Sequence, residues 1–157
     1  LTRLVERVGA ARYDTVVCLD LLNHVADDHR FLSEVAQVLR PGGRLVLAAP
    51  AHPALLGRRD RSLGHLRRYT RSGIRALLGR YRLQIASLRP WNTLAVPIYV
   101  LIEQVLRQRI SDGVRYGRDR RFGSLPNDLL RLWYLHVENR VPFPIGLSWF
   151  IIAHKVS

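Results

Sequence analysis

The chain has 157 residues, 48% of them hydrophobic, and a formal net charge of +13. This length suits one domain with a hydrophobic core and is short for two. The single cysteine, Cys18, excludes an internal disulfide and favours a cytoplasmic location, and the apolar run at residues 94–102 is too short for a membrane span, which needs about 20 residues. The sequence lacks methionine and begins at Leu1, so we expect a fragment of a longer protein.

The positive charge is almost entirely arginine, since only Lys155 among the 25 basic residues is a lysine. Clustered cations attract nucleic acids and anionic membranes because binding releases counterions. A strong arginine bias, however, often reflects the codon usage of a GC-rich genome. The net charge therefore weighs little in favour of a nucleic-acid partner.

The first elements in chain order form a strand, a helix and a second strand. Residues 13–19 (YDTVVCL) have the pattern of a buried parallel strand. Asp27 and Asp28 are candidate caps for a helix whose apolar residues recur at helical spacing up to Arg40. Residues 41–43 (PGG) end this helix, and residues 44–49 form the next strand. This is a βαβ unit with an expected right-handed crossover.

The next segment alternates helix and strand again. Thr70 is a good N-cap for a helix that carries apolar residues at positions 74, 77 and 78. Residues 81–88 alternate as a strand does, less cleanly at Ser87. The strongly apolar pattern of residues 93–109 predicts a helix packed deeply in the core, with Pro97 in its first turn.

The last third of the chain is the least regular. Residues 108–127 contain five arginines and several glycines, which predicts an exposed loop. Asn127 or Asp128 is expected to cap a helix that runs to about Asn139. Residues 147–154 have the pattern of a final core strand.

Residues 13–50, YDTVVCLDLLNHVADDHRFLSEVAQVLRPGGRLVLAAP, carry a resemblance to a known family. They resemble the second half of a class I S-adenosylmethionine-dependent methyltransferase of the small-molecule, ubiquinone-biosynthesis-like type. That family has a strand of the form FDxVV, a D-x-L-E-H turn, a helix that ends in VLRPGG, and a further strand. Residues 64–78 (GHLRRYTRSGIRALL) and the C-terminal PIGLSWFIIAHK resemble a narrower subgroup of it.

The resemblance implies an α/β, Rossmann-like three-layer methyltransferase fold that is N-terminally truncated, whose remaining sheet is mostly parallel with one antiparallel strand. Residues 1–157 would be the C-terminal part of a single domain, with a helical and basic excursion at about 93–140. The family's Gly-rich cofactor loop and its ribose-binding acidic residue are absent here, so about three strands are expected before Leu1. On its own the chain is expected to be inactive.

The resemblance also places one half of a cofactor site. Leu19, Asp20 and Leu21 lie where the family contacts the methionine and sulfonium portion of S-adenosylmethionine, at the carboxyl end of a strand, where open parallel sheets bind ligands. His24 occupies the position of the family's histidine near the cofactor, or else bonds to backbone at the entry to a helix. Asn23 replaces the family's usual glutamate.

The acceptor site is predicted in residues 51–69, because this loop leaves the same edge of the sheet. Its candidate catalytic residues are His52, His65, Arg68 and Tyr69. His65 would take a proton from an acceptor hydroxyl, Arg68 would hold an anionic group, and Tyr69 would orient the substrate. In the alternative interpretation, Arg68 and Tyr69 only pack and hydrogen-bond beside the cap at Thr70.

The sequence therefore predicts methyl transfer from S-adenosylmethionine to a small-molecule or lipid-like acceptor. Two alternatives stay open: a nucleic-acid-binding module that uses the arginines of residues 108–121 with Tyr116 and Phe122, and a peripheral membrane contact through residues 94–102 and the helix at Trp133. No metal site is predicted, because the histidines and Cys18 show no zinc spacing. The hydrolase G-x-S-x-G and the phosphate-binding G-x-x-x-x-G-K motifs do not occur either.

Overall fold

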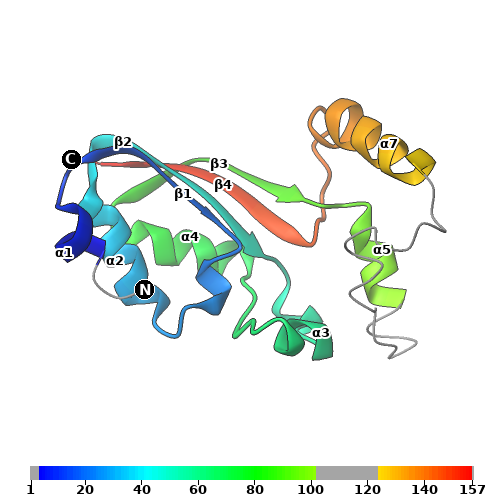
Figure 1. Cartoon of the computed structure of the whole chain (residues 1–157), viewed down its shortest axis with the longest axis horizontal. Coiled ribbons are helices and arrows are strands. Elements are labelled where there is room, and N and C mark those ends of the chain that lie inside the picture. Colours follow the sequence, from blue (N-terminus) through cyan, green and yellow to red (C-terminus); the bar gives the residue numbers. More distant parts are fainter. Residues whose placement is uncertain (1–3, 102–123, 157) are drawn as a thin grey trace.

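The computed structural model describes residues 4–101 and 124–156, which build a four-stranded sheet with helices on one of its faces (Figure 1). The strands are β1 (Tyr13–Leu19), β2 (Leu39–Pro50), β3 (Leu83–Trp91) and β4 (Ser148–Lys155). Their order in the sheet is β1-β2-β4-β3. β1 and β2 are parallel, and β4 is antiparallel to both β2 and β3. The predicted α/β sheet, mostly parallel with one antiparallel strand, is confirmed.

The helices fall into two groups. α1 (Leu4–Val8), α2 (Asp28–Val38) and α4 (Arg71–Gly79) lie on one face of the sheet (Figure 1). α3 (Arg58–Ser62), α5 (Ala95–Tyr99) and α7 (Ser124–Leu132) lie at one end of the sheet. Short 3₁₀ turns follow β1 at Leu22–His24 and β2 at Pro53–Leu55, and a π-helical turn, Trp133–Glu138, follows α7. None of the described helices is long and apolar enough to cross a membrane.

The βαβ unit forms as predicted, with one change at the PGG turn. Asp27 caps α2, since its side chain accepts a hydrogen bond from the Arg30 backbone N–H at 2.8 Å. β2 begins before the turn rather than after it: Leu39 pairs with Tyr13, and Arg44 pairs with Thr15. Residues 40–43 therefore bulge out of the ladder, and Gly42 (φ 75°) supplies the left-handed backbone that this bulge needs.

The hydrophobic core lies between the sheet and the two longer helices of its covered face. From the sheet it takes fully buried side chains of β2 and β4, and from the helices the apolar stripes of α2 and α4. Burial of each such side chain contributes ~1.5–3 kcal/mol to the free energy of folding. Its members include Leu45, Leu47, Ile151, Leu32, Val35, Ile74 and Leu78.

The other face of the sheet is much more exposed. Val17 and Leu19 of the edge strand β1 point to this face and are 58% and 57% exposed. They alternate with Cys18, which is 4% exposed and faces the core. Burial raises the pKa of the Cys18 thiol to about 11, so the thiol is neutral at physiological pH.

The elements after the βαβ unit were predicted at nearly the right places. Thr70 caps α4 by accepting from the Gly73 N–H at 2.9 Å, as predicted. β3 begins at Leu83 instead of residue 81 and extends to Trp91. The imperfect alternation near Ser87 marks a register shift between Ile85 and Ser87 in the pairing with β4.

The predicted deep burial of the helix that starts at residue 93 is wrong for its described part. The helix α5 lies beyond the end of the sheet, and Leu101 is 53% exposed (Figure 1). Leu129, Leu130 and Leu132 of α7 are exposed for the same reason, with Leu129 at 67% and Leu132 at 52%. No sheet face lies beneath these helices, so their apolar positions have no core to enter. The arginine-rich loop, with Tyr116 and Phe122, lies outside the described residues.

The last helix begins earlier than predicted. α7 starts at Ser124, with Pro126 in the first turn, where a missing backbone N–H does no harm. The π-helical turn is held to the end of β3 by Glu138, which is 4% exposed. The Glu138 carboxylate accepts hydrogen bonds from the Thr93 N–H and the Trp133 Nε1–H, both at 2.8 Å.

Candidate functional site

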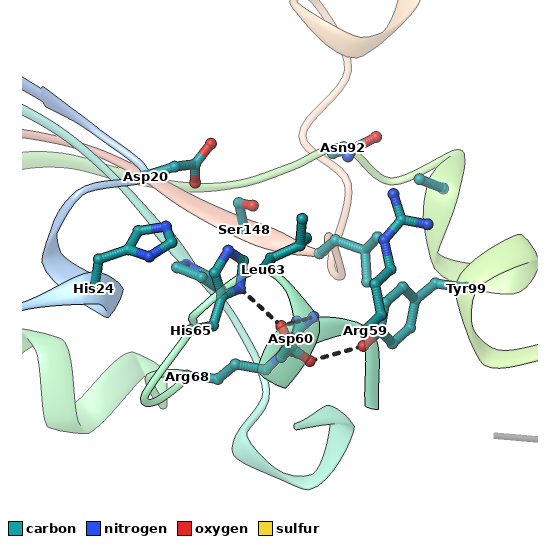
Figure 2. A pocket seen from close by; sticks show the side chains of 13 residues that line it. Asp20, His24, Arg59, Asp60, Leu63, His65, Arg68, Asn92, Tyr99 and Ser148 are labelled. Carbon is teal, nitrogen blue, oxygen red and sulfur yellow. Dashed lines mark hydrogen bonds and ion pairs between the residues drawn. The ribbon is translucent and has the colours of Figure 1, made fainter. Parts of the chain in front are cut away.

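A pocket of about 420 Å³ opens at the edge of the sheet where β1, β2 and β3 end and β4 begins. Each strand contributes to its lining: Asp20 follows β1, Pro50 ends β2, Asn92 follows β3 and Ser148 begins β4 (Figure 2). Open α/β sheets bind their ligands at the carboxyl ends of the parallel strands. The pocket is therefore where the sequence predicted a site.

Three of the five non-glycine residues that have a positive φ in the described part of the chain lie along this edge. Asp20 (φ 49°) and Asn92 (φ 64°) come directly after β1 and β3, and His52 (φ 59°) lies two residues beyond β2. Residues other than glycine rarely adopt this left-handed backbone conformation, which costs about 1–3 kcal/mol per residue. Strained residues cluster at functional sites, so this edge is a candidate site on backbone grounds as well.

The floor of the pocket is built on a buried carboxylate, Asp60 of α3, which is 1% exposed. We call Asp60, His65, Arg68 and Tyr99 the Asp60 cluster. The Asp60 oxygens accept hydrogen bonds from Arg68 Nε at 3.0 and 3.1 Å, Arg68 Nη2 at 2.9 Å, His65 Nδ1 at 2.9 Å, the Tyr99 hydroxyl at 2.8 Å and the Gly57 backbone N–H at 3.0 Å.

These donors decide the charge of Asp60. Burial by itself raises the pKa of its carboxyl group, but the hydrogen bonds from Arg68, Gly57, Tyr99 and His65 outweigh burial and bring the pKa below its usual range. Asp60 is thus a carboxylate at neutral pH, and its oxygens can only accept hydrogen bonds.

This carboxylate determines which nitrogen of His65 carries the proton. A neutral imidazole that donates from Nδ1 leaves Nε2 as a proton acceptor. Figure 2 shows the second ring nitrogen of His65 on the side away from Asp60, towards Asp20 and Ser148. The His65 side chain is 16% exposed and lines the pocket, so Nε2 is accessible from it.

His24 lies beside His65 and has a similar arrangement of protons. Its Nδ1 lies 3.1 Å from the backbone oxygen of Gly64, which can only accept, so this nitrogen carries the proton. The rings of His24 and His65 meet edge to face with centroids 4.8 Å apart. His24 therefore lines the pocket and bonds to the backbone of Gly64, and its contact with the cofactor stays a prediction.

Arg68 lines the pocket, but its donors point into the protein. The side chain is 5% exposed, and besides Asp60 it bonds to the carbonyl of Ala51 at 3.0 Å. Its guanidinium carbon lies 4.9 Å from the centre of the Tyr99 ring, a cation–π contact. These contacts match the alternative in which Arg68 stabilises the loop.

Four of the predicted residues lie outside the lining of this pocket. Tyr69 is 7% exposed and its hydroxyl donates to Asp28 at 3.1 Å or to the Leu22 carbonyl at 3.3 Å, and burial strongly raises its pKa. His52 stacks obliquely on Trp149, and its buried Nε2 has no hydrogen-bond partner among the described residues. Leu19 points to the open sheet face and Leu21 packs against the core.

Three important residues of the site were missed in the sequence: Asp60, Tyr99 and Asn92. One signal for Asp60 was present, because it is the only acidic residue in the sequence between Glu34 and Glu103 and five arginines lie within residues 58–68. Tyr99 had no such signal, since its contact with Asp60 spans 39 positions of the chain. In residues 4–101 and 124–156, no group of three or more His, Cys, Asp or Glu side chains is placed to hold a metal ion.

The comparisons with known proteins agree with this fold. Residues 5–47 match the family model described as a methyltransferase domain. No curated protein matches the chain. Among solved structures, a putative methyltransferase from Bacillus halodurans is 17% identical with a TM-score of 0.54, and the match covers 94% of this chain and 72% of the other.

Two further solved structures show the same likeness. The S-adenosylmethionine-dependent methyltransferase of Methanosarcina mazei is 18% identical with a TM-score of 0.51, over 94% of this chain and 61% of its own. The geranyl diphosphate C-methyltransferase of Streptomyces coelicolor, solved with geranyl diphosphate and S-adenosyl-L-homocysteine, is 12% identical with a TM-score of 0.53, over 94% and 49%. The chain spans less than two thirds of most structures it matches.

The comparisons thus confirm the predicted methyltransferase fold, and residues 5–47 match a methyltransferase domain. At these identities the structures show a shared fold alone. The ubiquinone-biosynthesis-like subtype and the position of the chain within a longer protein remain predictions.

Proposed function

From a methyltransferase-family segment and a class I methyltransferase fold, we propose that this chain supplies the acceptor side of an S-adenosylmethionine-dependent methyltransferase. Its acceptor is a small-molecule or lipid-like compound. The observation that carries the proposal is the pocket at the carboxyl edge of the sheet, because the segment that matches the family leads into it: β1 ends beside Asp20, and β2 ends at Pro50.

The residues of the pocket fit one end of the cofactor. S-adenosylmethionine carries positive charge on its sulfonium and its α-ammonium group, and the Asp20 carboxylate faces the pocket with the complementary charge (Figure 2). His24 lines the same wall. Leu19 and Leu21 flank Asp20 but lie outside the lining of the pocket, so their contact with the cofactor stays a prediction. When bound, the cofactor supplies an electrophilic methyl group on a good leaving group, so the protein contributes mainly alignment.

The predicted acceptor loop, residues 51–69, contributes much of the remaining wall. Its lining side chains are Arg59, Asp60, Leu63, His65 and Arg68. Leu63, with Ala95 and Leu147, gives the pocket apolar surface, while Asn92 and Ser148 offer hydrogen-bonding groups. An apolar cavity with a few convergent polar groups is typical of sites for small organic molecules.

Binding of the cofactor tests the proposal. Titration calorimetry with S-adenosylmethionine should use the polypeptide encoded by the complete reading frame. We expect Asp20→Asn to weaken binding about tenfold, through loss of one charge-assisted contact. The matched control is Asp14→Asn on β1, which removes an exposed carboxylate paired with Arg40 at the opposite edge of the sheet and should leave the affinity for S-adenosylmethionine unchanged. Equal affinity in both variants would contradict the role of Asp20, and no binding by the wild type would contradict the function.

Exposed leucines of α7 and of the π-helical turn that follows it favour a lipid-like acceptor met at a membrane surface. Leu129, Leu132 and Leu135 are each about half exposed or more, on a chain with a net charge of +13. An apolar helix surface on a cationic protein suits an anionic bilayer. Co-sedimentation with phosphatidylglycerol vesicles should exceed that with phosphatidylcholine vesicles and fall in a Leu129→Ser/Leu132→Ser variant. Equal sedimentation of both proteins would contradict this contact.

A further inference from the structure

We propose that His65 is the general base of this site, with Asp60 as its positioning residue, and that the acceptor is an alcohol or phenol whose hydroxyl must lose a proton for methyl transfer. The inference deepens the proposed function and rests on it. It starts from the Asp60 carboxylate, which holds the proton of His65 at Nδ1 and leaves Nε2 unprotonated towards the pocket.

The geometry of the Asp60 cluster singles out the imidazole as its reactive member. The side chains of Asp60 and Arg68 are only 2% and 5% exposed, whereas that of His65 is 16% exposed. Arg68 already bonds to both carboxylate oxygens and compensates the buried charge. His65 is therefore not needed to neutralise Asp60, and its side chain is more exposed than those of Asp60 and Arg68 in the pocket that all three line.

The surroundings of His65 carry charges of both signs. Asp60 and Arg59 approach from α3, His24 from the turn after β1, Asp20 from the end of β1, Arg68 from the acceptor loop and Tyr99 from α5. The Asp60 carboxylate makes direct contact with the imidazole and stabilises the imidazolium that proton uptake creates. The depressed pKa of Asp60 keeps that carboxylate ionised throughout the physiological range.

The proposed step is a direct transfer of the methyl group to the acceptor oxygen. The acceptor hydroxyl transfers its proton to Nε2 of His65 while its oxygen attacks the methyl carbon. The new bond joins oxygen to that carbon, and the bond between carbon and sulfur breaks with its electron pair going to sulfur. A neutral ether and a neutral thioether result, and the proton on His65 passes to solvent through the open pocket.

This arrangement favours a hydroxyl over an acceptor that is already an anion. A carboxylate needs no base, and it would meet the negative charge of Asp20 in the same pocket. A phenol has a pKa of about 10 and is neutral at physiological pH, so it depends on a base. General base catalysis contributes about 10²–10⁴-fold to such transfers.

The protonation state of His65 tests the inference without any methyl transfer. In ¹⁵N NMR spectra of the wild-type chain at neutral to mildly alkaline pH, His65 should be the Nδ1–H tautomer, and Asp60→Asn should shift the population towards Nε2–H. The signal that disappears in the His65→Gln variant is assigned to His65. The matched control is His29, an exposed histidine whose Nδ1 contacts the Tyr81 hydroxyl at 2.9 Å and which Asp60→Asn should leave unchanged. An Nε2–H tautomer in the wild type would overturn the inference.

Transfer assays then test the acceptor class. S-adenosylmethionine with a labelled methyl group is offered with 4-methylphenol or 4-methylbenzoate to the polypeptide of the complete reading frame. His65→Gln should lower transfer to the phenol by about 10²-fold, and His29→Gln should leave it unchanged. Transfer to the benzoate alone, or undiminished transfer to the phenol in His65→Gln, would overturn the inference and leave methyl transfer standing. No transfer to either compound would count against the proposed function, and the tautomer of His65 would still decide the inference.

Discussion

Two buried aspartates, Asp28 and Asp60, each contact an arginine and a tyrosine hydroxyl, and they lie on opposite sides of the segment of residues 67–69. In the Asp60 cluster, Arg68 and the Tyr99 hydroxyl bind Asp60. In what we call the Asp28 cluster, Arg67 Nη1 lies 3.0 Å and the Tyr69 hydroxyl 3.1 Å from Asp28 Oδ2. Adjacent arginines thus serve different carboxylates. Only the Asp60 cluster includes an imidazole and faces the pocket.

The alternation of extended backbone explains how one segment serves both clusters. Tyr69 forms a parallel bridge with Ala51, so the chain is strand-like at this point. Successive side chains of a strand point to opposite sides. Arg67 and Tyr69 accordingly reach Asp28, and Arg68 reaches Asp60. The comparison teaches that similar donors can surround carboxylates in different settings: burial and the presence of His65 distinguish the Asp60 cluster, for which we propose a reactive role, from the Asp28 cluster.

The largest expected effect is a loss of stability on replacement of Arg68, which distinguishes Arg68 from Arg67. Arg68→Ala leaves the carboxylate of Asp60 buried without its main partner, and loss of one member of a buried ion pair costs about 3–5 kcal/mol. Urea unfolding should show this loss of stability. Arg68→Lys keeps the charge but not the two-pronged contact and should fall between wild type and Arg68→Ala. If Arg68→Ala lowered the free energy of unfolding by less than about 1 kcal/mol, the Asp60–Arg68 ion pair would contribute no more than an ordinary surface ion pair.

The next effect concerns acid stability. The pKa of Asp60 is lower in the folded chain than the unfolded value of about 3.9, so its contribution to stability is complete above that value and is lost as pH falls through the lower, folded pKa. The urea midpoint of the wild type should therefore decline below pH 4, and Asp60→Asn should remove part of that decline. Asp14→Asn, at an exposed pair with Arg40, should preserve the wild-type profile.

A smaller effect is expected at Tyr69. Tyr69→Phe removes the hydroxyl that bonds to Asp28 and the Leu22 carbonyl, which should cost about 1–2 kcal/mol in thermal unfolding. Since burial raises the pKa of Tyr69, alkaline titration of the folded wild type should leave this phenol neutral until the protein unfolds. If Tyr69→Phe abolished methyl transfer without loss of stability, the Asp28 cluster would have a catalytic role after all.

The smallest effect is expected at Arg67, the partner of Asp28. The Arg67 side chain is 33% exposed, so solvent screens its ion pair, and Arg67→Ala should cost about 1 kcal/mol or less. The measurement is the same urea unfolding series. A cost equal to that of Arg68→Ala would remove the distinction between the two clusters.

Much of the fold was predictable because its signals are local. The strand at Tyr13, the caps at Asp27 and Thr70 and the last strand all follow from patterns within a few residues, whereas the antiparallel direction of one strand was implied by the resemblance. The location of the site at the sheet edge followed from the same topology. Of the proposed site residues, Asp20, His24, His65 and Arg68 line the pocket.

The rest depended on contacts between distant parts of the chain. The apolar patterns after residue 93 predict helices correctly, but burial requires a sheet face beneath them, and α5 and α7 lie beyond the end of the sheet. Asp60 and Tyr99 were missed because each gains its role only from the other and from Arg68.

The sequence by itself determined that residues 13–50 form a strand, a helix and a strand, because apolar spacing, caps and glycines act over one or two turns of chain. It also placed the candidate site at the carboxyl edge, since topology follows from the order of these elements. Only the tertiary structure decided that Arg68 faces Asp60 while Arg67 faces Asp28. It also decided that His65 hydrogen-bonds to a buried carboxylate. The position of a partner in space, and the burial that makes it matter, are not encoded in local spacing.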